Sequence, residues 1–81
     1  MRQKAHIIIK IDHQTIPANV RYWSRLSNGS MDWGYFRESA QEYYPAVGIR
    51  TAKALSRVWP GQYRVVAYLS GATVYDSQVT S

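Results

Sequence analysis

The feature that most constrains the fold is an Asn-Gly pair at positions 28 and 29. Both residue types tolerate positive φ angles, which the tight turns between antiparallel strands require. The flanking runs, residues 19–26 and 31–37, alternate in polarity with a period of two, which is typical of half-buried strands. The sequence therefore predicts an antiparallel hairpin centred on this turn.

Three further strands are predicted on either side of this hairpin. Residues 5–12 alternate so that every second side chain is isoleucine, and residues 63–69 and 73–78 form a second hairpin around Ser70-Gly71. The face of the first strand that we expect to lie on the core carries Ile7, Ile9 and Ile11.

A single helix is predicted between the two hairpins. Pro45 suits a first helical turn, where its missing N–H has no partner to lose, and residues 46–59 have helical spacing. Pro60-Gly61 ends the helix. Residues 38–44 before it fit either the end of a strand or the start of a helix and are treated as a connector. The apolar stripe that should lie on the sheet consists of Gly48, Ala52, Leu55 and Trp59.

The predicted order is β-β-β-α-β-β, which gives the α+β class: a two-layer sandwich of about five antiparallel strands with one helix on one face. The 81 residues suffice for one hydrophobic core, so residues 1–81 are expected to form a single domain. The expected core contains Ile7, Ile9, Leu55, Trp59 and Val65.

Composition and charge point to an intracellular binding protein. Ten Lys and Arg against five Asp and Glu give a net charge of +5, which favours approach to polyanions or acidic protein surfaces. The absence of cysteine excludes disulfides and thiolate-bound zinc. No apolar run approaches the length of a membrane span, and the N-terminal run is too short for a secretion signal. No membrane association is expected.

No arrangement of residues typical of catalysis is present. His6 and His13 stand seven residues apart outside any metal-binding motif, and no serine occupies a nucleophile motif. Glu38 and Glu42 are spaced i, i+4, where a solvated or ion-paired role beside Arg37 is favoured over acid–base chemistry. The glycines do not form a phosphate-binding loop. We therefore expect no enzymatic activity, no cofactor and no metal.

The first candidate binding surface is the exposed face of the predicted helix. Arg50, Lys53 and Arg57 recur at i, i+3 and i+7, opposite the apolar stripe, and no acidic residue occurs between Glu42 and Asp76. The alternative interpretation is the ordinary solvated side of an amphipathic helix, although such sides usually carry both signs of charge.

The second candidate surface is on the strand before the Asn-Gly turn. Alternation places Arg21, Trp23 and Arg25 on one face, and these residue types are enriched in binding hot spots. Tyr43 and Tyr44 add further candidate contacts. In the alternative interpretation, the Arg side chains shield a Trp that packs against the neighbouring strand.

The architecture resembles that of some small phage-encoded anti-CRISPR proteins that inhibit type I surveillance complexes. The comparable region is residues 20–79, with Thr51-Ala52-Lys53-Ala54-Leu55 in the helix and Tyr63-Arg64-Val65-Val66 in the strand that follows. The resemblance implies a host protein or ribonucleoprotein partner. The basic chain departs from the acidic, DNA-mimicking members of that group, so duplex mimicry is not expected.

The expected function is therefore that of a non-enzymatic inhibitor that blocks a host nucleic-acid-targeting complex by protein–protein contact. The alternative is a basic nucleic-acid-binding module, in which Arg side chains contact phosphates and aromatic side chains stack on bases. A homodimer is a further candidate assembly. The sequence predicts neither the identity of the partner nor the strand order.

Overall fold

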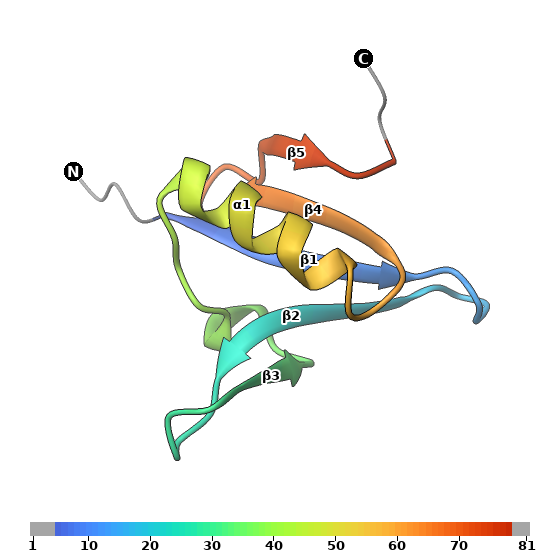
Figure 1. Cartoon of the computed structure of the whole chain (residues 1–81), viewed down its shortest axis with the longest axis horizontal. Coiled ribbons are helices and arrows are strands. Elements are labelled where there is room, and N and C mark those ends of the chain that lie inside the picture. Colours follow the sequence, from blue (N-terminus) through green and yellow to red (C-terminus); the bar gives the residue numbers. More distant parts are fainter. Residues whose placement is uncertain (1–4, 79–81) are drawn as a thin grey trace.

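The computed structural model describes residues 5–78 and confirms the predicted α+β architecture, in which one helix packs against a five-stranded antiparallel sheet (Figure 1). A short 3-10 turn, η1 (Arg37–Ser39), precedes the helix α1 (Pro45–Ser56). The strands are β1 (His6–Asp12), β2 (Asn19–Arg25), β3 (Met31–Gly34), β4 (Gln62–Ala67) and β5 (Thr73–Asp76).

The strand order in the sheet is β3-β2-β1-β4-β5, so the first strand of the chain lies at its centre. The two predicted hairpins form: β2 pairs with β3, and β4 pairs with β5. Gly29 has a φ of 88°. This is the left-handed conformation that glycine adopts easily and that was expected in the Asn-Gly turn. β1 joins the two hairpins by pairing antiparallel with β2 on one side and β4 on the other.

The connector before α1 is attached to the sheet by backbone hydrogen bonds. The Gln41 amide donates to the Trp23 carbonyl at 2.8 Å, and Tyr43 and His6 exchange two hydrogen bonds at 2.8 and 3.2 Å. Residues 40–43 thus contact the end of β2 and the start of β1. The ambiguity of residues 38–44 in the sequence is explained by this mixture of a 3-10 turn and isolated bridges.

The main core lies between α1 and the central strands β1 and β4. Ala52 and Leu55 point from the helix onto Ile8, Tyr63 and Val65, and all five are buried. Gly48 permits this close approach, because a Cβ atom there would lie 3.2 Å from Val65 Cγ1. The predicted helical stripe is confirmed for Gly48, Ala52 and Leu55.

Aromatic rings extend this core toward β2 and β3. The Trp33 ring centroid lies 4.8 Å from that of Trp23, 6.1 Å from Trp59 and 5.7 Å from Tyr63. Trp59 closes the cluster at 5.9 Å from Trp23. These four residues, called here the aromatic cluster, stand on two strands of the first hairpin, on the segment after α1 and on β4.

Part of the predicted core assignment is wrong. The helix covers the Ile8 side of β1, whereas Ile7, Ile9 and Ile11 lie on the opposite face by strand alternation. Ile7 is buried there and Ile9 is only partly buried, while Trp59 keeps 39% of its surface exposed. The reason is that residues 7–9 are all isoleucine, so the apolar pattern cannot show which face the helix covers.

Candidate functional site

Trp23 is not available as an exposed anchor, and this part of the predicted binding surface is wrong. Its side chain is only 8% exposed and packs in the aromatic cluster. Alternation does place it on the same side of β2 as Arg21 and Arg25, as predicted. That side faces the core, since the rings of Trp33 and Trp59 cover the indole.

The two arginines that flank Trp23 are held on the β2–β3 hairpin. The Arg21 guanidinium lies 4.1 Å from the centroid of the Tyr35 ring, a cation–π contact. Arg25 donates to Gln41 Oε1 at 3.3 Å and to the Gly29 carbonyl at 3.4 Å. These contacts fix the guanidiniums locally and do not join them to the cations of α1.

The three predicted cations of α1 do form one surface. Arg50, Lys53 and Arg57 are exposed and line a shallow groove with Ala46, Ile49 and Ala54. We call these six residues the helix face. Within residues 5–78, neither the Arg50 nor the Arg57 guanidinium has a hydrogen-bond or ion-pair partner. Lys53 Nζ lies 5.6 Å from the centroid of the Tyr75 ring.

The helix face can contribute to stability as well as to binding. Lys53 lies in the last turn of α1 and Arg57 follows it as the C-cap residue, where cations interact favourably with the partial negative charge of the helix end. Arg50 lies in the middle of the helix and gains nothing from either end. Its exposed, unpaired guanidinium is the clearest candidate contact on this face.

The two candidate tyrosines have different environments. Tyr43 is partly buried against the core, and this burial raises the pKa of its phenol. Its backbone is bonded to His6, so it serves the sheet. Tyr44 occupies the N-cap position of α1 and remains 45% exposed. Of the two, Tyr44 is the more exposed and lies beside the helix.

Positive charge is concentrated on the helix side of the sheet. By strand alternation, Lys10, Arg21 and Arg25 share the side that carries α1, and the helix adds Arg50, Lys53 and Arg57. Lys10 Nζ lies 4.7 Å from the centroid of the Trp33 ring. Arg64, in contrast, lies on the opposite side and forms an ion pair with Asp76 at 2.9 Å. Among residues 5–78, the excess of positive charge therefore lies mainly on the helix side of the sheet.

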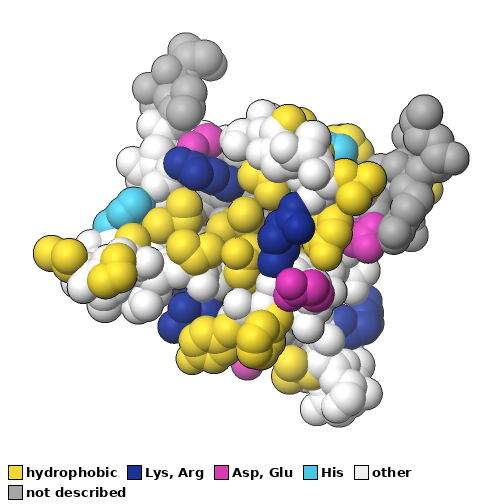
Figure 2. Space-filling model, turned by 180° about the vertical axis from the view of Figure 1, so that it is seen from behind, with side chains coloured by type: hydrophobic (Ala, Val, Ile, Leu, Met, Phe, Trp, Pro, Cys, Tyr) yellow, Lys and Arg dark blue, Asp and Glu magenta, His cyan; other side chains and the backbone are white. Residues whose placement is uncertain are grey.

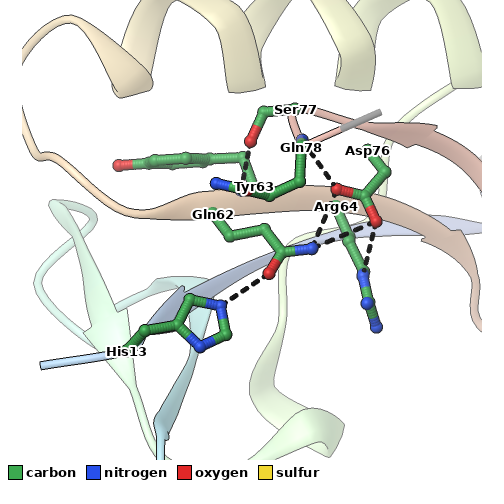
Figure 3. A network of polar contacts seen from close by, with 7 residues as sticks. All are labelled: His13, Gln62, Tyr63, Arg64, Asp76, Ser77 and Gln78. Atoms are coloured by element: carbon green, nitrogen blue, oxygen red, sulfur yellow. Dashed lines mark hydrogen bonds and ion pairs between the residues drawn. The ribbon is translucent and has the colours of Figure 1, made fainter. Parts of the chain in front are cut away.

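Sequence reasoning missed a polar network at the start of β4 (Figure 3). His13 Nε2 lies 2.6 Å from Gln62 Oε1, and Gln62 Nε2 donates to both carboxylate oxygens of Asp76 at 2.9 and 3.1 Å. The hydrogen bond from the Gln78 amide is the main cause that lowers the pKa of Asp76, followed by the bonds from Gln62 and Arg64. The signal in the sequence is weak, because these residues are separated by up to 65 positions.

The geometry of this network favours a structural role. A neutral amide stands between His13 and Asp76, so the carboxylate does not polarise the imidazole directly, as it does in a catalytic triad. The adjoining pocket is lined by Asp12, His13, Gln14, Gln62, Gln78 and the Pro60-Gly61 turn. Within residues 5–78, no group of three or more His, Asp or Glu side chains could hold a metal ion.

Comparisons with protein-family models, with curated proteins and with solved structures gave no match. None of the helices in residues 5–78 has the length and apolar character needed to cross a bilayer.

Proposed function

We propose that this chain is a non-enzymatic binding protein that acts by protein–protein contact and docks an acidic partner on its helix face. The observation that carries the proposal is the combination of three exposed cations with the apolar side chains of Ala46, Ile49 and Ala54 in one groove. Cations around a small apolar floor fit a protein surface that presents carboxylates beside aliphatic groups.

Protein is favoured over nucleic acid by the position of the aromatic residues. Binding of single-stranded nucleic acid relies on exposed rings on which bases stack. Trp23, the candidate ring on β2, is buried against Trp33, and the exposed Tyr35 ring is already in contact with Arg21. The helix face itself contributes cations and aliphatic groups, which suit a folded partner better than unstacked bases.

The partner class that we propose is a host nucleic-acid-targeting complex, such as a CRISPR–Cas surveillance complex, which the chain would block in the cytoplasm of the host cell. The architectural resemblance to small phage inhibitors supports this choice. A basic helix face would compete for an acidic protein surface of such a complex, which differs from inhibition by mimicry of DNA.

The alternative is direct nucleic-acid binding, and one specific observation favours it. Arg50 and Arg57 have no acidic neighbour within residues 5–78, so both guanidiniums are free to contact phosphates. In that case, affinity would fall steeply with salt concentration as counterions are released, and binding would be largely independent of sequence.

A capture experiment with matched variants tests the proposal. Tagged wild type, R50E/K53E and R21E/R25E proteins are incubated with host lysate, with and without nuclease. We expect wild type to retain a protein partner after nuclease treatment, R50E/K53E to lose it, and R21E/R25E, which carries the same change in charge on the β2–β3 hairpin, to keep it.

The affinity of each variant for the purified partner is then measured by calorimetry, alongside its melting temperature. Loss of all captured material on nuclease treatment would favour the nucleic-acid alternative. Binding that survives R50E/K53E but not R21E/R25E would move the docking surface from the helix to the hairpin.

A further inference from the structure

The sheet face opposite α1 is apolar around β1 and is not covered by α1, although the short turn η1 contacts β2. Ile11 lies beside Val20, and Ile9 lies between Tyr22 and Arg64, all on this side. In addition, Gly34 lies opposite Tyr22 on β3 and leaves the tyrosine without a neighbouring side chain on that flank. We call Ile9, Ile11, Val20 and Tyr22 the open sheet face.

The apolar residues of this face retain contact with solvent. Val20 is 39% exposed, and Ile9, Ile11 and Tyr22 are partly exposed. Figure 2, which views the molecule from this side, shows hydrophobic side chains over much of its centre, interrupted by a basic group, with further basic and acidic groups around them. Removal of isoleucine and valine side chains from water is favourable, so a partner that covered these residues would be stabilised by their burial.

The charges around the face are balanced, in contrast to the helix side. Arg64 is paired with Asp76 at 2.9 Å, and the side chain of Asp32 falls on this side by its register with Ser24. Two copies can therefore approach through this face without meeting the excess positive charge that residues 5–78 carry on the helix side. Approach through the helix faces would instead bring Arg50, Lys53 and Arg57 of one copy against the same cations of the other.

We propose that the open sheet face pairs two copies of this chain about a twofold axis. In such an isologous contact the same patch serves both partners, so an apolar centre meets an apolar centre and the flanking groups of opposite sign meet at the rim. The two helix faces would then lie on the outer sides of the dimer. This inference stands independently of what the helix face binds.

The size of the face suits a small dimer. Five strands about 4.8 Å apart and about six residues long give a sheet of roughly 24 by 20 Å. The broad side of the molecule measures 36 by 35 Å, against a thickness of 22 Å. A stable interface buries about 800 Å² on each partner. The sheet alone covers roughly 480 Å² in projection, so such an interface also needs the surrounding parts of the broad side of the molecule.

Sedimentation velocity over a concentration series in the micromolar range tests the proposal. We expect the wild type to change from 9.3 kDa to twice that mass as concentration rises. Val20→Glu should raise the dimer dissociation constant at least about tenfold, because a carboxylate enters the apolar contact from each copy. The matched control is Val58→Glu, the same substitution at an exposed residue just after α1, which should leave association unchanged.

A distance measurement keeps the test valid even if Val20→Glu disturbs the fold. The chain has no cysteine, so single spin labels can be placed on Thr73→Cys, at the edge of the sheet, or Lys53→Cys, on the helix face. Each copy is 22 Å thick, so in a back-to-back dimer the two Lys53 labels should lie about 44 Å apart, which is twice that thickness. The two Thr73 labels should lie closer together than the Lys53 labels. A wild type that stays monomeric throughout, or Lys53 labels closer than Thr73 labels, would overturn the proposal.

Discussion

Trp23 is held by aromatic packing on two sides. Its ring centroid lies 4.8 Å from that of Trp33 and 5.9 Å from that of Trp59. We expect Trp23→Ala to lower the free energy of unfolding by about 3–5 kcal/mol, the usual cost of truncating a buried aromatic residue. Urea unfolding measures this loss, and Arg25→Ala, at an exposed neighbour on the same strand, is the control. A loss below about 1 kcal/mol would contradict the core position.

Tyr63 makes the stability sensitive to high pH. Its buried hydroxyl donates to the Trp59 carbonyl at 2.6 Å, and desolvation raises the pKa of the phenol from 10.0 to about 12. The folded state therefore holds this proton more tightly than the unfolded state. The contribution of Tyr63 to stability is complete below pH 10 and declines as the pH rises toward 12.

The Tyr63→Phe variant isolates this effect from the titration of the other tyrosines. It should cost about 1 kcal/mol at neutral pH through loss of one hydrogen bond. It should also flatten the fall in stability between pH 10 and 12, measured by urea unfolding at several pH values. An identical alkaline profile in wild type and variant would contradict the assignment.

The helix α1 is held on the sheet by a narrow row of buried residues, Gly48, Ala52 and Leu55. Leu55 is buried against Tyr63 and Val65, and a helix of 12 residues gains most of its stability from such packing. Leu55→Ala should lower the free energy of unfolding by about 2–5 kcal/mol. Ala54 is exposed on the same turn, so Ala54→Ser serves as a control that should cost well under 1 kcal/mol. A change below about 0.5 kcal/mol for Leu55→Ala would exclude this packing.

Asp76 on β5 is linked to β4 by the hydrogen bonds from Gln62 and by the ion pair with Arg64. The pKa of its carboxyl group is lowered from 3.8, and the largest cause is the hydrogen bond from the Gln78 amide. The folded state therefore favours the carboxylate. Its contribution to stability is present above about pH 4 and is lost as the pH falls through the lowered pKa. Asp76→Asn should destabilise the protein at neutral pH and reduce the acid dependence of its melting temperature. An unchanged acid profile would show that other carboxyl groups dominate.

For the whole molecule, the uneven charge predicts an oriented interaction with polyanions. R50E/K53E should elute from a polyanionic resin at much lower salt than the wild type, because it reverses charges on the side where they are concentrated. The control is R37E/R64E, which makes the same change in net charge with Arg64 on the opposite side, and its melting temperature is measured as well because Arg64 forms the ion pair with Asp76. Equal shifts for both variants would show that retention depends on net charge alone.

The sequence predicted most elements because their signals are local. The Asn28-Gly29 turn, the alternation along β2 and the spacing of Gly48, Ala52 and Leu55 each involve residues within one or two turns of each other. The grouping of Arg50, Lys53 and Arg57 on one face was predictable for the same reason. The His13–Gln62–Asp76 network could not be predicted, because it joins three separate segments.

The sequence by itself determined the α+β class, the two hairpins and the one-signed helix face, since periodicity and turn chemistry act over a few residues. Only the tertiary structure decided which side of β1 the helix covers, because the three isoleucines of residues 7–9 are apolar on both sides. The same choice buried Trp23 beneath Trp33 and Trp59 and left Ile9 and Ile11 on the uncovered side. Packing between distant segments settled these points, and such contacts have no local signature.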